Sequence, residues 1–177
     1  KTAVEDPSSI DTRSSDDRQG SPFAAATQYQ LVKIHAHGGL GRVWQAVDSQ
    51  LRREVAIKEM LPKKSTNVNA RRRFLLEAQV TGQLTHPHIV PVYQLSTSPE
   101  TGNPFYVMRM LRGESLRSAI QAARGATGVL TPIDRRRFLT MFISVCNALA
   151  YANARGVIHR DLKPENVILG EYGEVLV

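Results

Sequence analysis

The chain has 177 residues, enough for one domain with a buried core, and its formal net charge is +7. A basic chain suits an acidic partner, but the arginines are scattered along amphipathic segments without interleaved aromatic residues, which argues against nucleic-acid binding. The single cysteine excludes an internal disulfide, and the lack of a run of about 18 apolar residues predicts no membrane span within the sequence.

Residues 1–27 are rich in Ser, Asp, Arg and Gln and carry few large apolar side chains. Such a segment cannot bury enough apolar surface to offset its ordering entropy, so we predict a disordered leader. It also lacks the apolar stretch of a signal peptide. Because the chain begins with Lys1 and ends within a strand-like segment, we expect it to be a piece of a longer protein.

The first predicted strand, residues 29–34, leads into a glycine-rich turn over residues 36–43, Ala-His-Gly-Gly-Leu-Gly-Arg-Val. Glycine lets backbone N–H groups approach phosphate oxygens because no Cβ stands in the way. An isolated glycine turn is explained equally well by a plain hairpin. Its meaning therefore depends on the segments that follow, beginning with a second predicted strand over residues 42–47.

The next predicted strand, residues 54–58, reads Glu-Val-Ala-Ile-Lys. Alternation places Ala56 and Lys58 on one face and Val55 and Ile57 on the other. Lys58 on its own would be taken for a solvated strand lysine, but its position after a glycine-rich hairpin favours a functional role over that interpretation. A helix is predicted over residues 69–84, and Glu77 lies within it.

Two further helices are predicted in the second half of the chain. Residues 115–123 form a short helix, and Thr131, Pro132 and Asp134 start a long one that ends at Gly156. Five apolar residues recur in the long helix at helical spacing and predict one core face, on which Cys146 is an inert buried thiol: Phe138, Phe142, Val145, Cys146 and Leu149.

The segment over residues 157–169 reads Val-Ile-His-Arg-Asp-Leu-Lys-Pro-Glu-Asn-Val-Ile-Leu. Its apolar flanks can anchor in a core, while the loop between them presents Asp161, Lys163 and Asn166. A carboxylate can accept a proton from a hydroxyl, an ammonium can neutralise a phosphate, and an amide oxygen can bind Mg²⁺. These are three of the groups that phosphoryl transfer requires.

This segment matches the pattern H-R-D-L-x-x-x-N, and a glycine-rich loop, a V-A-I-K strand and a helix with a glutamate precede it. The sequence therefore resembles the eukaryotic-like (Hanks-type) bacterial serine/threonine protein kinases, and Lys163-Pro164-Glu165 is similar to their Ser/Thr branch rather than the tyrosine branch. The resemblance covers about residues 28–177. It implies an α+β protein-kinase-like fold, with an antiparallel five-stranded N-lobe sheet and C-helix over residues 28–111. The hinge exit and an incomplete, mainly helical C-lobe follow over residues 112–177.

The resemblance also implies ATP and Mg²⁺ as cofactors, with Asp161 orienting or deprotonating the substrate hydroxyl and Lys163 neutralising the γ-phosphoryl group. Lys58 would bind the α- and β-phosphates and pair with Glu77, and Asn166 would hold Mg²⁺. Ala36 stands where the family has its first loop glycine, and because Ala is the smallest replacement we expect somewhat tighter sterics rather than loss of ATP binding. The residues that the resemblance assigns to nucleotide binding are Ile34, Ala36, His37, Gly38, Gly39, Leu40, Gly41, Val43, Ala56, Lys58, Met108, Arg109, Met110, Leu111 and Ile168.

Two neighbours of Asp161 receive supporting roles from the resemblance. His159 is expected to pack beneath the loop, and Arg160 to bind a phosphate on the activation loop, so control by phosphorylation is predicted. Residues 174–177 resemble the strand that leads to the D-F-G motif, whose Asp would lie beyond Val177. We therefore expect residues 1–177 alone to transfer negligible phosphate.

The sequence thus predicts a cytoplasmic kinase domain that phosphorylates protein Ser and Thr hydroxyls and pairs as a homodimer for trans-autophosphorylation, with any membrane anchor beyond Val177. The alternative is a pseudokinase or nucleotide-binding scaffold, which loss of Lys58 or Asp161 would favour; both are present. A small-molecule kinase of the same fold is a third hypothesis. Two H-x-H pairs lack a third ligand, so they predict no metal site: His35/His37 and His86/His88.

Overall fold

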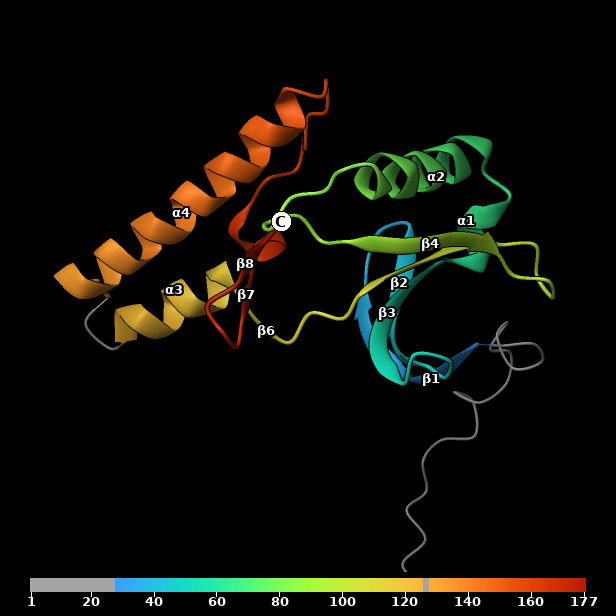
Figure 1. Ribbon diagram of the computed structural model, residues 1–177, viewed down its shortest axis with the longest axis horizontal. Coiled ribbons are helices and arrows are strands. Elements are labelled where there is room, and N and C mark those ends of the chain that lie inside the picture. The colour runs from blue at the N-terminus through green and yellow to red at the C-terminus, as the bar shows by residue number, and fades with distance from the viewer. Residues whose placement is uncertain (1–27, 126–127) are drawn as a thin grey trace, which may run out of the picture.

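The computed structural model of the chain describes residues 28–125 and 128–177, so the predicted leader, residues 1–27, lies outside the described residues. Figure 1 shows a sheet covered on one side by a helix, followed by a second half built of helices and a small sheet. Among the described residues, no helix is long and apolar enough to cross a membrane. The elements are β1 (Tyr29–His37), β2 (Gly41–Asp48), β3 (Arg53–Met60), α1 (Pro62–Ser65), α2 (Val68–Gly82), β4 (Val92–Thr97), β5 (Pro104–Arg109), β6 (Gly113–Ser115), α3 (Leu116–Arg124), α4 (Pro132–Asn153), the 3₁₀ helix η3 (Pro164–Asn166), β7 (Ile168–Gly170) and β8 (Val175–Leu176).

The larger sheet has five antiparallel strands in the order β1-β2-β3-β5-β4, which confirms the predicted N-lobe sheet. β1 extends past its predicted end at Ile34 and continues to His37. Ala36 and His37 therefore belong to the strand, and the glycine-rich turn is confined to residues 38–40.

The alternation of side chains gives this sheet two different buried faces. Directly paired residues of neighbouring strands share a face, so Val43, Lys58 and Tyr106 lie on one face, whereas Trp44 and Ile57 lie on the other. The face without Lys58 carries its own apolar core: Tyr29, Trp44, Ala46, Val55, Ile57, Phe105 and Val107.

Helix α2 covers the face that carries Lys58. Asn67 caps its N-terminus by accepting a hydrogen bond from the backbone N–H of Ala70 at 3.0 Å. Phe74 and Ala78, one helical turn apart, are buried against the sheet, and the Phe74 ring lies 5.4 Å from the ring of Tyr106. This packing fixes the rotation of α2 and therefore the direction in which its polar residues point.

Helix α4 carries a narrower core face than the sequence predicted. Its N-terminus is closed by a capping box between Thr131 and Asp134, and Val145 is buried. The prediction that Phe142 and Cys146 are buried was wrong, because Phe142 is 57% exposed and Cys146 is exposed. The packed stripe runs instead through residues 138, 141, 145 and 149, and residues one position further along are turned by about 100° away from it.

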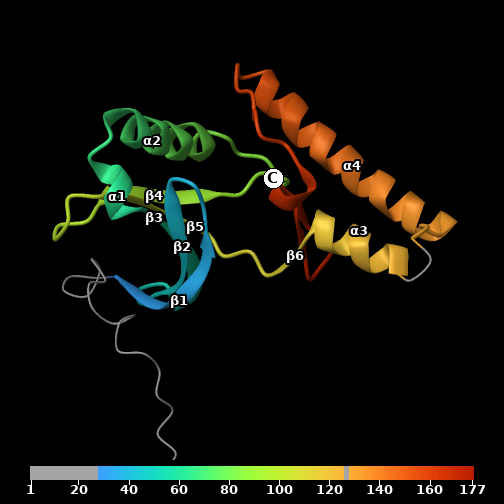
Figure 2. The ribbon, with the colours of Figure 1, turned by 180° about the vertical axis from the view of Figure 1, so that it is seen from behind.

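Backbone hydrogen bonds connect the segment after α2 to the end of the chain. Val177 donates its N–H to the carbonyl of His88 at 2.9 Å and accepts from the N–H of Val90 at 3.3 Å. The backbone N–H of Thr85 donates to the hydroxyl of Tyr151 on α4 at 3.1 Å. Figures 1 and 2 show the C-terminus lying between the sheet with α2 and the helical half, so this segment joins the two halves.

Asp48, at the end of β2, is the buried carboxylate that organises the β2–β3 turn. It is 1% exposed and accepts hydrogen bonds from the backbone N–H groups of Gln50 and Leu51 at 3.1 and 3.2 Å. Burial acts to raise the pKa of Asp48, but the hydrogen bonds from Leu51, Gln28 and Gln50 outweigh burial, and the pKa is lowered overall.

We expect the substitution Asp48→Asn, which removes the charge and keeps the shape, to destabilise the fold near neutral pH. A lowered pKa means that ionised Asp48 stabilises the folded state above the pKa of the unfolded chain and loses this effect as pH falls through the folded pKa. Thermal unfolding of both proteins should therefore show a gap in melting temperature at about pH 7 that narrows toward about pH 3. A gap of constant size across this range would contradict the assignment.

Candidate active site

The glycine-rich turn is held to the end of β3 by its backbone. The N–H of Gly38 donates to the carbonyl of Gly41 at 2.7 Å and closes the turn, and the N–H of Leu61 donates to the carbonyl of Leu40 at 3.1 Å. A Cβ at Gly41 would lie 2.5 Å from the carbonyl oxygen of Glu59, so only glycine fits there, whereas Gly39 faces open space. The tip of the turn is therefore accessible, and its second arm is tightly packed.

Lys58 and Glu77 form an ion pair between β3 and α2. The Lys58 Nζ and Glu77 Oε1 atoms lie 2.5 Å apart, and the side chains are 18% and 42% exposed. The Lys58 ammonium also lies 5.6 Å from the ring centroid of Tyr106 and 6.0 Å from that of Phe74. The ammonium is thus held at one position on the sheet face to which Val43 also belongs.

Tyr106 is a member of this site that the sequence did not indicate. Its hydroxyl donates to Glu77 Oε1 at 2.7 Å, so the same carboxylate oxygen accepts from both Lys58 and Tyr106. Burial, together with the negative charge of Glu77, raises the pKa of Tyr106 and keeps the hydroxyl protonated. The feature that indicates this role is the pairing of Lys58 with Tyr106 across β3 and β5, which can be recognised only when the strand register is known.

The loop over residues 157–166 begins where α4 ends. Gly156 adopts a φ of +75°, and the N–H of Val157 donates to the carbonyl of Ala152 at 3.0 Å, which terminates the helix. Arg160 has a φ of +63°, a backbone conformation that costs energy in a residue other than glycine. The chain turns at Arg160, and Asp161, the first of the three polar site residues of the loop, follows this turn.

Asp161, Lys163 and Asn166 converge in this loop. The Asp161 Oδ2 atom lies 3.0 Å from Lys163 Nζ and accepts a hydrogen bond from Asn166 Nδ2 at 3.1 Å, while Asn166 Nδ2 also donates to the Asp161 carbonyl at 2.8 Å. The hydrogen bond from Lys163, followed by that from Asn166, lowers the pKa of Asp161. Asp161 is therefore ionised near neutral pH and able to accept a hydrogen bond from a hydroxyl.

Asn166 is suited to hold a Mg²⁺ ion. Because its amide nitrogen donates to Asp161, its amide oxygen remains as the atom that can ligate a cation. Oxygen donors suit Mg²⁺, which takes few protein ligands and completes its shell with phosphate oxygens and water. No cluster of three or more His, Cys, Asp and Glu residues that could hold a metal ion is found within residues 28–125 and 128–177.

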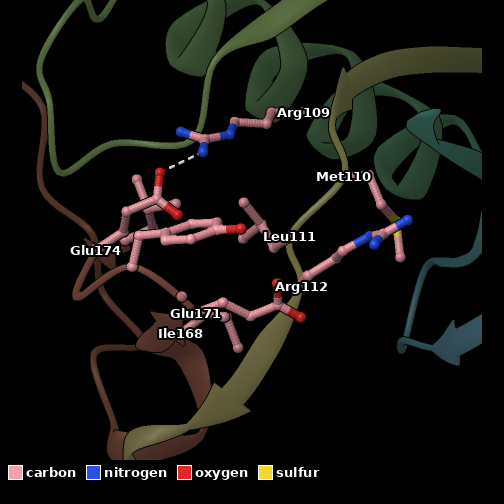
Figure 3. Close-up of a pocket in the computed structure, with 10 residues that line it drawn as sticks. Arg109, Met110, Leu111, Arg112, Ile168, Glu171 and Glu174 are labelled. Atoms are coloured by element: carbon pink, nitrogen blue, oxygen red, sulfur yellow. Dashed lines mark hydrogen bonds and ion pairs between the residues drawn. The ribbon is translucent and has the colours of Figure 1, made fainter. Parts of the chain in front are cut away.

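A cavity of about 130 Å³, drawn in Figure 3, is lined by the segment between the two halves and by residues of β7, β8 and the turn between them. Arg109 donates its backbone N–H to Pro91 at 3.0 Å, and its side chain forms an ion pair with Glu174 in the turn before β8. Ala56 and Met108, also assigned to the nucleotide, are cross-strand partners on the face of Lys58 but do not line this cavity. The lining residues are Arg109, Met110, Leu111, Arg112, Ile168, Gly170, Glu171, Tyr172, Glu174 and Leu176.

The residues on either side of Asp161 are exposed. The prediction that His159 packs beneath the loop was wrong, because its side chain lies at the surface beside Ile158, which is 70% exposed. The loop is held from its other end, where Glu165 of η3 forms an ion pair with Arg117 of α3. Arg160 is exposed and accessible to an anion.

The site residues thus form two groups, Lys58 with Glu77 and Tyr106 on the sheet side and Asp161 with Lys163 and Asn166 on the helical side. Within the described parts of the chain, no direct side-chain hydrogen bond or ion pair joins the two groups. Figure 2 shows from behind that the connecting segments lie between the sheet with α2 and the half that contains α3 and α4. A substrate that contacts both groups would therefore bind between the two halves.

Comparison with known proteins agrees with this arrangement. The sequence model of the protein kinase domain matches residues 29–177. The chain is 39% identical over 154 residues to the serine/threonine-protein kinase PknD of Protochlamydia amoebophila and 35% identical over 154 residues to PknD of Chlamydia trachomatis serovar L2b. These matches cover 84% and 85% of the chain but only 16% of each of these relatives.

Solved structures give the same result. The crystal structure of the Mycobacterium tuberculosis PknI kinase domain superposes with a TM-score of 0.69 at 25% identity, covering 89% of this chain and 61% of that domain. The protein kinase fold, with its five-stranded N-lobe sheet and a partial C-lobe, is thereby confirmed. The chain therefore belongs to the protein kinase domain family.

Proposed function

We propose that this protein transfers the γ-phosphoryl group of ATP to Ser and Thr hydroxyls of protein substrates. The observation that carries the proposal is the convergence of Asp161, Lys163 and Asn166, which places an ionised carboxylate, an ammonium and an amide oxygen in one loop. Phosphoryl transfer depends mainly on positioning and on stabilisation of charge, and these three groups supply both.

In this proposal Asp161 accepts a hydrogen bond from the substrate hydroxyl and takes its proton as the hydroxyl oxygen bonds to the γ-phosphorus. The bond between the γ-phosphorus and the bridging oxygen of ATP breaks in the same transfer, and ADP leaves with that oxygen. Lys163, which contacts the Asp161 carboxylate at 3.0 Å, extends its remaining N–H donors toward the transferred group. Asn166 holds Mg²⁺ through its amide oxygen, and the bound ion neutralises negative charge on the phosphate oxygens. The ionised state of Asp161 supports its role as proton acceptor.

The nucleotide is proposed to bind beneath the glycine-rich turn, with Lys58 on its α- and β-phosphates. Glu77 forms an ion pair with this lysine, and Tyr106 donates a hydrogen bond to Glu77. The ammonium is therefore positioned before the nucleotide binds. The purine is proposed to contact the backbone of the hinge over residues 109–111, with Ile168 below it. The N–H of Arg109 is taken by Pro91, so its carbonyl is the group that it can offer to the purine edge.

Regulation is proposed to act through Arg160. Its guanidinium is exposed beside Asp161, and a planar guanidinium can bind a phosphate with two hydrogen bonds. A phosphate placed there would fix the strained turn at Arg160 and so the position of Asp161. Trans-autophosphorylation within a homodimer in the cytoplasm is the proposed source of that phosphate.

We expect the substitution Asp161→Asn to lower phosphoryl transfer by about 10²–10⁴-fold, because the proton acceptor is lost while the side-chain shape is kept. The measurement is transfer of labelled γ-phosphate from ATP to a protein substrate by the full-length gene product with Mg²⁺. Nucleotide binding should be preserved in this variant, and Glu100→Gln, an exposed carboxylate in the β4–β5 turn, serves as the control. Equal transfer by the unchanged protein and the Asp161→Asn variant would rule out this role and favour a scaffold.

We expect the substitution Tyr106→Phe to lower kcat/KM for ATP by about tenfold, since Glu77 loses one of the two donors that hold it beside Lys58. Steady-state kinetics at varied ATP concentration measure this loss. The matched control is Tyr29→Phe, which removes another buried tyrosine hydroxyl, the donor to Gln94 at 2.6 Å on the opposite face of the sheet. A similar loss in both variants would show a general effect on stability and contradict the specific role.

A further inference from the structure

A second charged group lies on the sheet face opposite Lys58. The Glu59 side chain is 2% exposed, and its Oε2 atom accepts hydrogen bonds from Arg42 Nε at 2.8 Å and from Trp44 Nε1 at 3.0 Å. The Arg42 guanidinium lies 4.7 Å from the centroid of the Trp44 ring. These three residues, Arg42, Trp44 and Glu59, form a closed cluster that we term the loop clamp.

The loop clamp joins directly onto the glycine-rich turn. Arg42 follows Gly41, which packs against the backbone of Glu59, and Leu40 accepts the N–H of Leu61 at 3.1 Å. Three consecutive residues, 40–42, which span the end of the turn and the start of β2, are therefore attached to residues 59–61 at the end of β3 and just beyond it. The other arm of the turn is less regular, because the pairing of β1 with β2 shifts register between Ile34 and Ala36.

We propose that the loop clamp is a positioning device that fixes the β2 arm of the glycine-rich turn and thereby raises its affinity for nucleotide phosphates. This inference rests on the proposed function, in which the turn binds ATP. The clamp contacts no substrate itself, since its side chains lie on the face opposite Lys58. It acts by holding the backbone N–H groups of the turn in one arrangement before the phosphates arrive.

The burial of Glu59 makes this attachment strong. A buried carboxylate that loses its charged partner is left with an uncompensated charge, so separation of Arg42 from Glu59 is unfavourable. The indole N–H of Trp44 occupies the same carboxylate oxygen and fixes its orientation. Any outward movement of the β2 arm at Arg42 would break these contacts together.

The other end of the same hairpin offers a matched control. There Arg53 lies 3.8 Å from the buried carboxylate of Asp48, and its guanidinium lies 4.1 Å from the centroid of the Tyr93 ring. Both arginines thus pair with a buried carboxylate across β2 and β3 and stack on an aromatic ring. Only Arg42 adjoins the glycine-rich turn.

The experiment compares Arg42→Met and Arg42→Lys with Arg53→Met in the full-length protein. The readouts are hydrogen exchange of the backbone amides over residues 38–43 and the dissociation constant of Mg²⁺-ATP. We expect Arg42→Met to speed exchange and to weaken nucleotide binding by about tenfold, with partial recovery in Arg42→Lys, which keeps the charge. Arg53→Met should leave both readouts at the values of the unchanged protein.

Two results would overturn the inference. One is unchanged exchange and unchanged nucleotide affinity in Arg42→Met; the other is an equal effect of Arg42→Met and Arg53→Met, which would indicate general stability. If the unchanged protein binds no nucleotide, the proposed function fails, but the exchange rates of residues 38–43 still decide the positioning role. Equal exchange in Arg42→Met and in the unchanged protein would then overturn the clamp on its own.

Discussion

The packing of α2 against the sheet is the constraint on which the arrangement of the N-lobe depends, and it places Glu77 beside Lys58. A pair that is partly exposed contributes little stability by itself, so packing positions the charges rather than the reverse. Phe74 and Ala78 seat α2 on the sheet, and Glu77, three residues after Phe74, is thereby carried to the edge of that contact. Tyr106 then satisfies the same carboxylate oxygen from the sheet side. The position of the Lys58 ammonium therefore depends on the packing of α2 against the sheet.

The loop that carries Asp161 is also positioned by packed residues, but these lie only in the segments that flank it. Its flanks are anchored, by the end of α4 on one side and by the buried residues Val167 and Leu169 on the other. The polar groups between these anchors are exposed, and they are ordered by their own hydrogen bonds and by the pair between Glu165 and Arg117. Rigid flanks with an exposed polar centre give precise placement together with access for a large substrate.

The sequence predicted the fold well because the motifs occur in a fixed order and each fits its local structure. It indicated Lys58 and Glu77 as partners, and the Lys58 Nζ and Glu77 Oε1 atoms lie 2.5 Å apart. It could not indicate Tyr106 or Glu59, whose roles depend on strand register and not on local spacing. Helical periodicity located the packed side of α4 but not its width, so Phe142 was placed in the core although it is 57% exposed. What the sequence missed was therefore set by tertiary contacts.

Strand β3 connects these features, since Lys58 and Glu59 are consecutive and point to opposite faces. On one face the ammonium pairs with Glu77 beside Tyr106, and on the other the carboxylate pairs with Arg42 beside Trp44. A register slip of one residue would exchange the two faces, placing a carboxylate toward the phosphates and an unpaired ammonium in the apolar core. The alternation of charge along β3 therefore specifies the register of the sheet and the chemistry of its two faces at once.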